Sequence, residues 1–142
     1  MKILRYVLAF FAGALVAGFV VAGIEALGHA VYPPPAGLDP TDLEQLKAMV
    51  ATLPVGALLF VLFAWAAGAY AGGLVAARIA PARRGVLAAA VGALMLAAVV
   101  ANLVMIPHPL WFAAAGIVAV LVTTSLAVLV GRRWDRAAAQ GA

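Results

Sequence analysis

Four long apolar stretches dominate this sequence and restrict what the chain can fold into. A helix rises about 1.5 Å per residue, so about 20 apolar residues cross the roughly 30 Å hydrocarbon core of a bilayer. We place the stretches at about residues 4–29, 55–77, 85–106 and 110–131. Hydrophobic residues make up 68% of the 142 residues, too much apolar surface for a soluble domain to bury. The sequence therefore predicts an all-α integral membrane protein, one transmembrane domain over residues 1–142 folded as an up-down-up-down four-helix bundle.

The first apolar stretch has a competing interpretation as a cleaved signal peptide. Gly28, His29 and Ala30 loosely resemble a small-residue cleavage site. The apolar region is longer than the usual signal core, however, and Glu25 and His29 are unfavourable just before a cleavage point. We therefore interpret the stretch as a retained membrane helix.

Residues 30–54 form a polar segment between the first two apolar stretches. Asp39 followed by Pro40 is typical of a helix N-cap with proline at the first helical position. Apolar residues then recur every three or four positions, at Leu43, Leu46, Val50 and Leu53. We predict a short amphipathic helix at about residues 40–52 that lies along the membrane surface. The alternative is that this helix forms a lid over the Glu25 region.

The positions of the basic residues predict how the chain is oriented. All Lys and Arg residues except Lys47 lie at the two termini or in the turn after the second stretch. The positive-inside rule therefore places both termini in the cytoplasm and puts the loop 30–54 and Pro107–Pro109 outside the cell (inner) membrane. The same distribution explains the net charge of +4. We expect the lipid bilayer as a partner and no nucleic acid.

Ionisable and amide side chains are rare within the apolar stretches. Glu25 and His29 are four residues apart, so they lie one turn apart on one helix face. Asn102 lies near the end of the third stretch, and His108 lies between two prolines just after it. The predicted orientation puts all four at the outer ends of their helices. Because a carboxylate within a membrane is costly, we interpret Glu25, His29, Asn102 and His108 as a candidate ligand or proton site.

Two tryptophans complete this candidate site. Trp65 lies deep in the second stretch, whereas tryptophans usually prefer the membrane interfaces. It either lines a pocket or packs in the core or against lipid. Trp111 begins the fourth stretch close to His108 and is also typical of an interface anchor.

Several kinds of chemistry fit these residues. Two imidazoles and a carboxylate are a common ligand set for zinc or another divalent ion, so Glu25, His29 and His108 form a metal hypothesis. Two histidines on different helices can instead hold a haem, and the same groups suit a proton relay in a small transporter. No P-loop, dinucleotide fingerprint, nucleophile elbow or zinc-protease motif is present, so we lean against an enzyme. We favour a site for a small ligand, ion or proton and leave the cofactor open.

Small residues predict where the helices pack closely. They repeat at helical spacing on the first three stretches, and the residues we select are Gly18, Ala22, Gly68, Gly72 and Gly92. Such faces also permit contact with another protein. The alternative function is therefore a structural or accessory subunit that packs against partner membrane proteins or against copies of itself.

Overall fold

The structure, a computed structural model, describes residues 1–39 and 41–141, and within them the chain forms five α-helices and no strand. The helices are α1 (Lys2–Val31), α2 (Leu43–Thr52), α3 (Val55–Ile79), α4 (Arg84–Met105) and α5 (Leu110–Gln140). All except α2 are long and apolar enough to cross a membrane. The predicted all-helical fold with four membrane-length helices is confirmed at this level.

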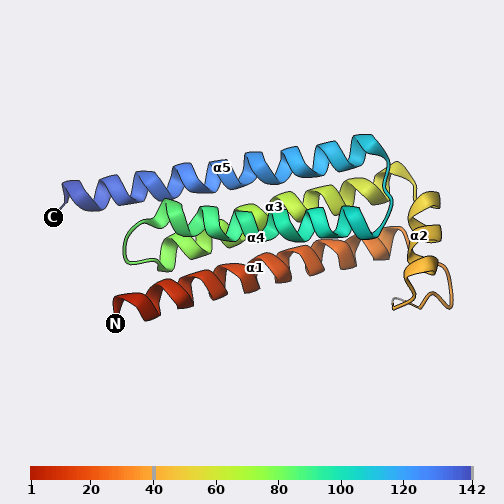
Figure 1. The fold of residues 1–142 in the computed structure, drawn as a ribbon, viewed down its shortest axis with the longest axis horizontal. Helices are drawn as coiled ribbons and strands as arrows, with labels where there is room; N and C mark the ends of the chain where they lie inside the picture. The colour runs from red at the N-terminus through yellow and green to blue at the C-terminus, as the bar shows by residue number, and fades with distance from the viewer. Residues whose placement is uncertain (40, 142) are drawn as a thin grey trace.

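The four long helices form an antiparallel bundle with α3 at its centre (Figure 1). Helix α3 packs against α1, α4 and α5, whereas α1 has its main contact with α3 and a smaller one with α4. Within the described residues α1 and α5 do not touch, and they lie on opposite sides of the α3–α4 pair (Figure 1). Figure 1 shows both chain termini at one end of the bundle, here named the terminal end, and α2 at the other, the α2 end.

Small residues bring α1 and α3 close together. A Cβ atom built on Gly72 would lie 2.5 Å from the carbonyl oxygen of Gly13 and 2.7 Å from the Cβ of Ala17. A Cβ atom on Gly68 would lie 2.7 Å from a methyl carbon of Val21. These separations are well inside van der Waals contact, so the two backbones approach as they do because Gly68 and Gly72 carry no side chain.

Gly18 and Ala22 do not form the helix contact expected of them. Both residues are exposed, and a Cβ atom on Gly18 would meet nothing within 4 Å. Helix α1 turns Gly13 and Ala17 toward α3 instead, and both are buried. The reason is that the two helices approach most closely near Gly72, which selects a different stripe of α1 from the one that carries Gly18.

Helices α4 and α5 also approach each other through glycine. Gly92, the remaining predicted packing residue, is buried and faces the side chain of Thr124. A Cβ atom on Gly131 would lie 2.8 Å from the backbone nitrogen of Gly85. Glycines therefore permit close packing of α4 against α5 at the terminal end of the pair, through Gly85 and Gly131, and nearer its middle, through Gly92.

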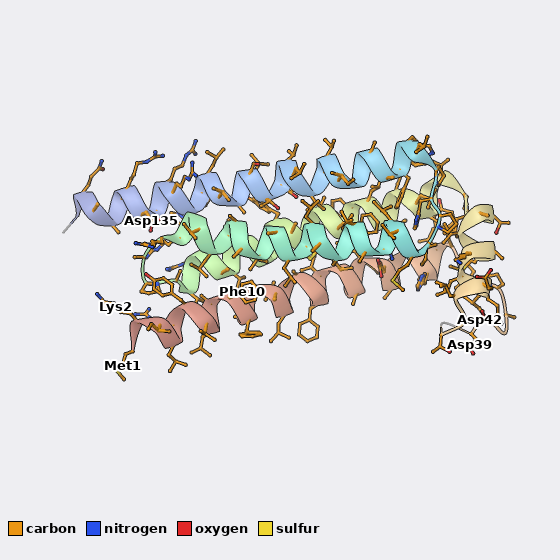
Figure 2. The ribbon with its side chains drawn as sticks, in the orientation of Figure 1. Met1, Lys2, Phe10, Asp39, Asp42 and Asp135 are labelled. Atoms are coloured by element: carbon orange, nitrogen blue, oxygen red, sulfur yellow. The ribbon has the colours of Figure 1, made fainter. Side chains whose placement is uncertain are left out.

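Helix α5 continues past residue 131, where the apolar stretch ends, to Gln140. Trp134 packs against buried alanines of α3, α4 and α5. The carboxylate of Asp135 accepts a hydrogen bond of 2.9 Å from the backbone N–H of Arg84, at the first residue of α4. Figure 2 shows Asp135 at the terminal end, next to the start of α4. These two contacts hold the extension in place, because Asp135 satisfies an N–H group that α4 leaves unpaired.

Helix α2 begins later than the sequence pattern indicates. Its N-cap is Asp42, whose side chain accepts hydrogen bonds from the backbone N–H groups of Glu44 and Gln45. Asp39, the expected cap, accepts instead from the N–H and hydroxyl of Thr41. The expected role of Pro40 lies outside the described residues. Either Asp39 or Asp42 can cap a helix, and the geometry of the loop favours Asp42.

Candidate functional site

A cavity of about 240 Å³ opens at the α2 end of the bundle, where α1, α3 and α4 meet α2. The four polar side chains that the sequence groups into one site all line it: Glu25, His29, Asn102 and His108. Tyr32, whose hydroxyl is also polar, joins them in the lining. The rest of the lining is mostly apolar or aromatic. A largely apolar pocket with a few convergent polar groups is the usual form of a small-ligand site.

Helix α1 supplies one wall of the cavity. Glu25, Gly28, His29 and Tyr32 line it, because they follow one another at the three- and four-residue steps of a helix face. Glu25 is half-buried, whereas His29 is exposed at the mouth. This wall is held against α3 through aromatic rings, since Gly28 packs on the ring of Phe60 and Tyr32 meets the same ring edge-on, with centroids 6.2 Å apart.

The connection between α4 and α5 supplies the opposite wall. The Nδ1 atom of His108 lies 2.7 Å from the carbonyl oxygen of Ile106. A carbonyl can only accept, so Nδ1 donates, and in the neutral ring Nε2 is the nitrogen able to accept a hydrogen bond. The imidazole also stacks on Phe112, with ring centroids 4.8 Å apart and planes 13° from parallel. One hydrogen bond and one stacking contact therefore orient His108.

Trp65 and Asn102 form the floor of the cavity. Trp65 is only 6% exposed and meets Phe112 edge-on, with centroids 5.3 Å apart. Its ring fits beside α5 because Gly116 leaves room, and a Cβ atom there would lie 2.9 Å from the indole. Asn102 is half-buried, one turn before the end of α4. Trp65 thus belongs both to the hydrophobic core and to the cavity lining.

Helix α2 covers this end of the bundle. Its lining side chains are Leu46, Met49 and Val50, followed by Leu53 just after the helix. Within the described residues the backbone of α2 does not come close to that of any other helix. The cover is therefore held by apolar side chains alone, between two connecting segments that each contain proline.

Two expectations for this site differ from what the structure shows: the place of Trp111 in the cavity lining and the clustering of the metal-ligand candidates. Trp111 is 44% exposed, lies outside the lining, and packs edge-on against Phe112. Glu25, His29 and His108 share the cavity, yet within the described residues no group of three His, Asp or Glu side chains is close enough to hold a metal ion. These positions lend no support to the metal hypothesis.

The sequence pattern did not point to Phe112, which the structure makes a central residue. It is fully buried and contacts His108, Trp65 and Trp111. A signal for it exists in the sequence, because the buried residues of α5 recur along one face as Phe112, Gly116, Val120, Ala127 and Gly131. The neighbouring Trp111 draws attention first, since an aromatic residue at a helix end fits an interface anchor.

The electrostatics of the cavity are set by one acidic group. Among the residues that the structure describes, Glu25 is the only carboxylate in the lining, and no Lys or Arg lines the cavity. Within the described residues the ion pair that forms joins Glu44 and Lys47 on the surface of α2, at 2.8 Å. The lining contains no serine or cysteine nucleophile. The cavity is therefore equipped to accept hydrogen bonds and to neutralise a positive charge.

Comparison with known proteins adds no family to this description. No protein-family model matches the chain, and neither a curated protein nor a solved structure matches it. The class of protein is defined by its fold: an all-helical chain with four helices long and apolar enough to span a membrane, which suggests an integral membrane protein.

Proposed function

We propose that this protein binds a small ligand in the cavity at the α2 end, without catalysing a reaction on it. The observation that carries this proposal is the shared lining: Glu25, His29, Asn102 and His108, supplied by α1, α4 and the α4–α5 connection, face one apolar cavity together with Trp65. Glu25 and His29 lie on α1, whereas Asn102 and His108 lie more than 70 residues later in the sequence, and the bundle brings both pairs to one cavity. Polar groups in an apolar pocket are the features that give a binding site its specificity.

The proposal includes an orientation in the cell membrane. The terminal end carries every Lys and Arg residue except Lys47, and the α2 end carries Asp39, Asp42 and Glu44. By the positive-inside rule, the termini lie in the cytoplasm and the cavity opens to the outside. Helix α2, with its apolar side chains toward the cavity, then lies at the outer membrane surface as a cover over the ligand.

The cavity can be tested without knowing its ligand, because the chain has no cysteine. Ala57 lines the cavity, whereas Ala69 lies on the same helix in the core, and both are buried. We expect N-ethylmaleimide to modify an Ala57→Cys variant much faster than an Ala69→Cys variant. A library of small compounds is then screened on the purified protein for those that slow modification of Ala57→Cys.

Compounds found in this way should depend on Glu25. We expect Glu25→Gln to lower their affinity by roughly tenfold or more, the effect of losing one hydrogen bond to a charged group. Glu44→Gln makes the same chemical change outside the cavity and should leave affinity unchanged. The proposal fails if Ala57→Cys reacts no faster than Ala69→Cys, or if no compound protects it.

A further inference from the structure

A second hollow adjoins the cavity, and its shape bears on the kind of ligand that fits. It is a groove of about 370 Å³ between α1 and α4. Glu25, Trp65 and Asn102 line both the groove and the cavity. The two hollows therefore adjoin at these three side chains, so a molecule in the groove also reaches the Glu25 carboxylate and the Trp65 ring.

The groove opens sideways, between two helices of membrane length. Its rim is formed by the small residues Gly18 and Ala22 on α1 and Ala98 on α4, all exposed. A Cβ atom on Gly18 would meet nothing within 4 Å, so the space beside it is open. In a bilayer this opening faces hydrocarbon. An apolar group can therefore lie in the groove without leaving the membrane environment.

The charge at the meeting point selects the polar part of the ligand. Among the described residues, Glu25 is the only carboxylate that lines either hollow, and no Lys or Arg lines them. The remaining ionisable lining groups, His29, Tyr32 and His108, lie on the cavity side. Trp65 adds an indole ring, and a carboxylate beside an aromatic ring is a recognition set for ammonium-type cations. Within the described residues Glu25 forms no ion pair, so a cation here would supply a partner for its carboxylate.

We propose that the ligand is a hydrophobic organic cation, with its charged group beside Glu25 and Trp65 and its apolar body in the groove between α1 and α4. This inference rests on the proposed function and adds the chemical class and placement of the ligand. An anion is disfavoured by Glu25, and a purely apolar molecule leaves the carboxylate without a partner. A small hydrophilic cation would leave the groove unfilled.

The test uses two probes of matched size and opposite charge, tetraphenylphosphonium and tetraphenylborate. Binding is measured by equilibrium dialysis of the purified full-length protein in detergent, with protein-free micelles subtracted. We expect saturable binding of tetraphenylphosphonium and none of tetraphenylborate. Glu25→Gln should weaken the cation by roughly tenfold or more, whereas Glu44→Gln should not.

The groove is tested by filling it. Gly18→Leu places a side chain in the groove, whereas Gly23→Leu makes the same change on α1 at a residue that does not line the groove. A Cβ atom at either position would meet nothing within 4 Å. We expect Gly18→Leu to weaken cation binding and Gly23→Leu to leave it unchanged. If Gly18→Leu fails to give folded protein, Ala98→Leu fills the groove from the α4 side.

Each other outcome overturns the inference. If tetraphenylborate binds as well as tetraphenylphosphonium, or if the Glu25→Gln variant binds the cation normally, the ligand is not the hydrophobic organic cation that we propose. Normal cation binding by the groove-filling variants refutes the placement of the apolar body in the groove. Absence of cation binding refutes the inference as a whole. Protection of Ala57→Cys by other compounds would then still support the proposed function.

Discussion

At the scale of single residues, the bundle depends on glycines, which carry no side chain and so allow close contact with a neighbouring helix. Gly72 meets Gly13 and Ala17 across the α1–α3 contact at distances that leave no space for a Cβ atom. Gly116 has the same role beside Trp65, where it makes room for the ring that forms the cavity floor. In a membrane, where lipid is as apolar as leucine, such close approach is a main source of helix association.

Gly72→Ala should destabilise the protein, because the added Cβ atom would lie 2.5 Å from the Gly13 carbonyl oxygen and the helices must separate to accept it. We expect a loss of about 1–3 kcal/mol in the free energy of unfolding, as for other overpacked cores. The measurement is unfolding of the purified protein by SDS titration in mixed micelles. Gly23→Ala is the control: its Cβ meets nothing within 4 Å, so its better helix propensity should leave stability equal or slightly higher. An equal loss in both variants would show that close packing at Gly72 is not the cause.

At the scale of elements, α2 differs from the other helices. It has ten residues, Leu43–Thr52, and an isolated helix of that length is marginal in water. Two features compensate: the cap formed by Asp42 and the apolar side chains that face the cavity. The absence of close backbone contacts between α2 and the other described helices is compatible with the proposed ligand site, which needs an entrance.

The cap makes α2 sensitive to acid. Hydrogen bonds from the backbone N–H and side chain of Gln45, and from the N–H of Glu44, hold the pKa of Asp42 below its ordinary value. Because the pKa is lower in the folded helix than in the unfolded segment, the stabilisation is complete above about pH 4 and is lost as the pH falls through the folded pKa. We expect the amide protection factors of Gln45 and Leu46 to fall over that range.

Asp42→Asn provides the comparison for this prediction. Asparagine caps a helix through a neutral carbonyl and does not titrate, so the acid-dependent loss of protection should be smaller in this variant. The Thr41 hydroxyl and N–H also lower the pKa of Asp39, and that contribution is present in both proteins. An unchanged pH profile in Asp42→Asn would exclude Asp42 as the origin of the effect.

At the scale of the whole molecule, the polar groups are divided between two ends. Asp39 and Asp42 lie at the α2 end, and Lys2 and Asp135 lie at the terminal end (Figure 2). This division supports the proposed orientation, because lysine and arginine are retained on the cytoplasmic side of a membrane. It also separates the cavity from every arginine of the chain.

Two cysteine variants test the orientation. Ala36 lies in the segment before α2, Ala82 lies in the turn between α3 and α4, and both are exposed. A membrane-impermeant maleimide added to intact cells should label Ala36→Cys and should label Ala82→Cys only after the membrane is permeabilised. The opposite pattern would invert the proposed orientation, and labelling of both in intact cells would show two orientations in one population.

The number of membrane-length helices and the approximate position of each are predictable from the sequence by itself, whereas the extension of α5 from residue 131 to Gln140 is not. Each of these helices corresponds to one uninterrupted run of apolar residues that is long enough to cross a bilayer. Such a run must satisfy its backbone hydrogen bonds internally, and a helix does so. The grouping of Glu25, His29, Asn102 and His108 also follows from counting, because helix length and alternating direction place them at one end. The charge distribution that underlies the proposed orientation can also be read from the sequence, because it depends only on where Lys and Arg residues lie along the chain.

Only the tertiary structure decided how each helix is rotated about its own axis. Helices that are apolar all round carry little periodic signal, so the sequence does not distinguish the stripe of Gly13 and Ala17 from that of Gly18 and Ala22. The same ambiguity drew attention to Trp111 in place of Phe112. For α2 the sequence favoured a helix along the membrane surface, with a lid over the Glu25 region as the alternative, and the structure shows that its apolar side chains line the cavity. Rotation is determined by which faces fit when all helices pack together. That is a property of pairs of helices, and it gives the cavity its lining and the groove its opening.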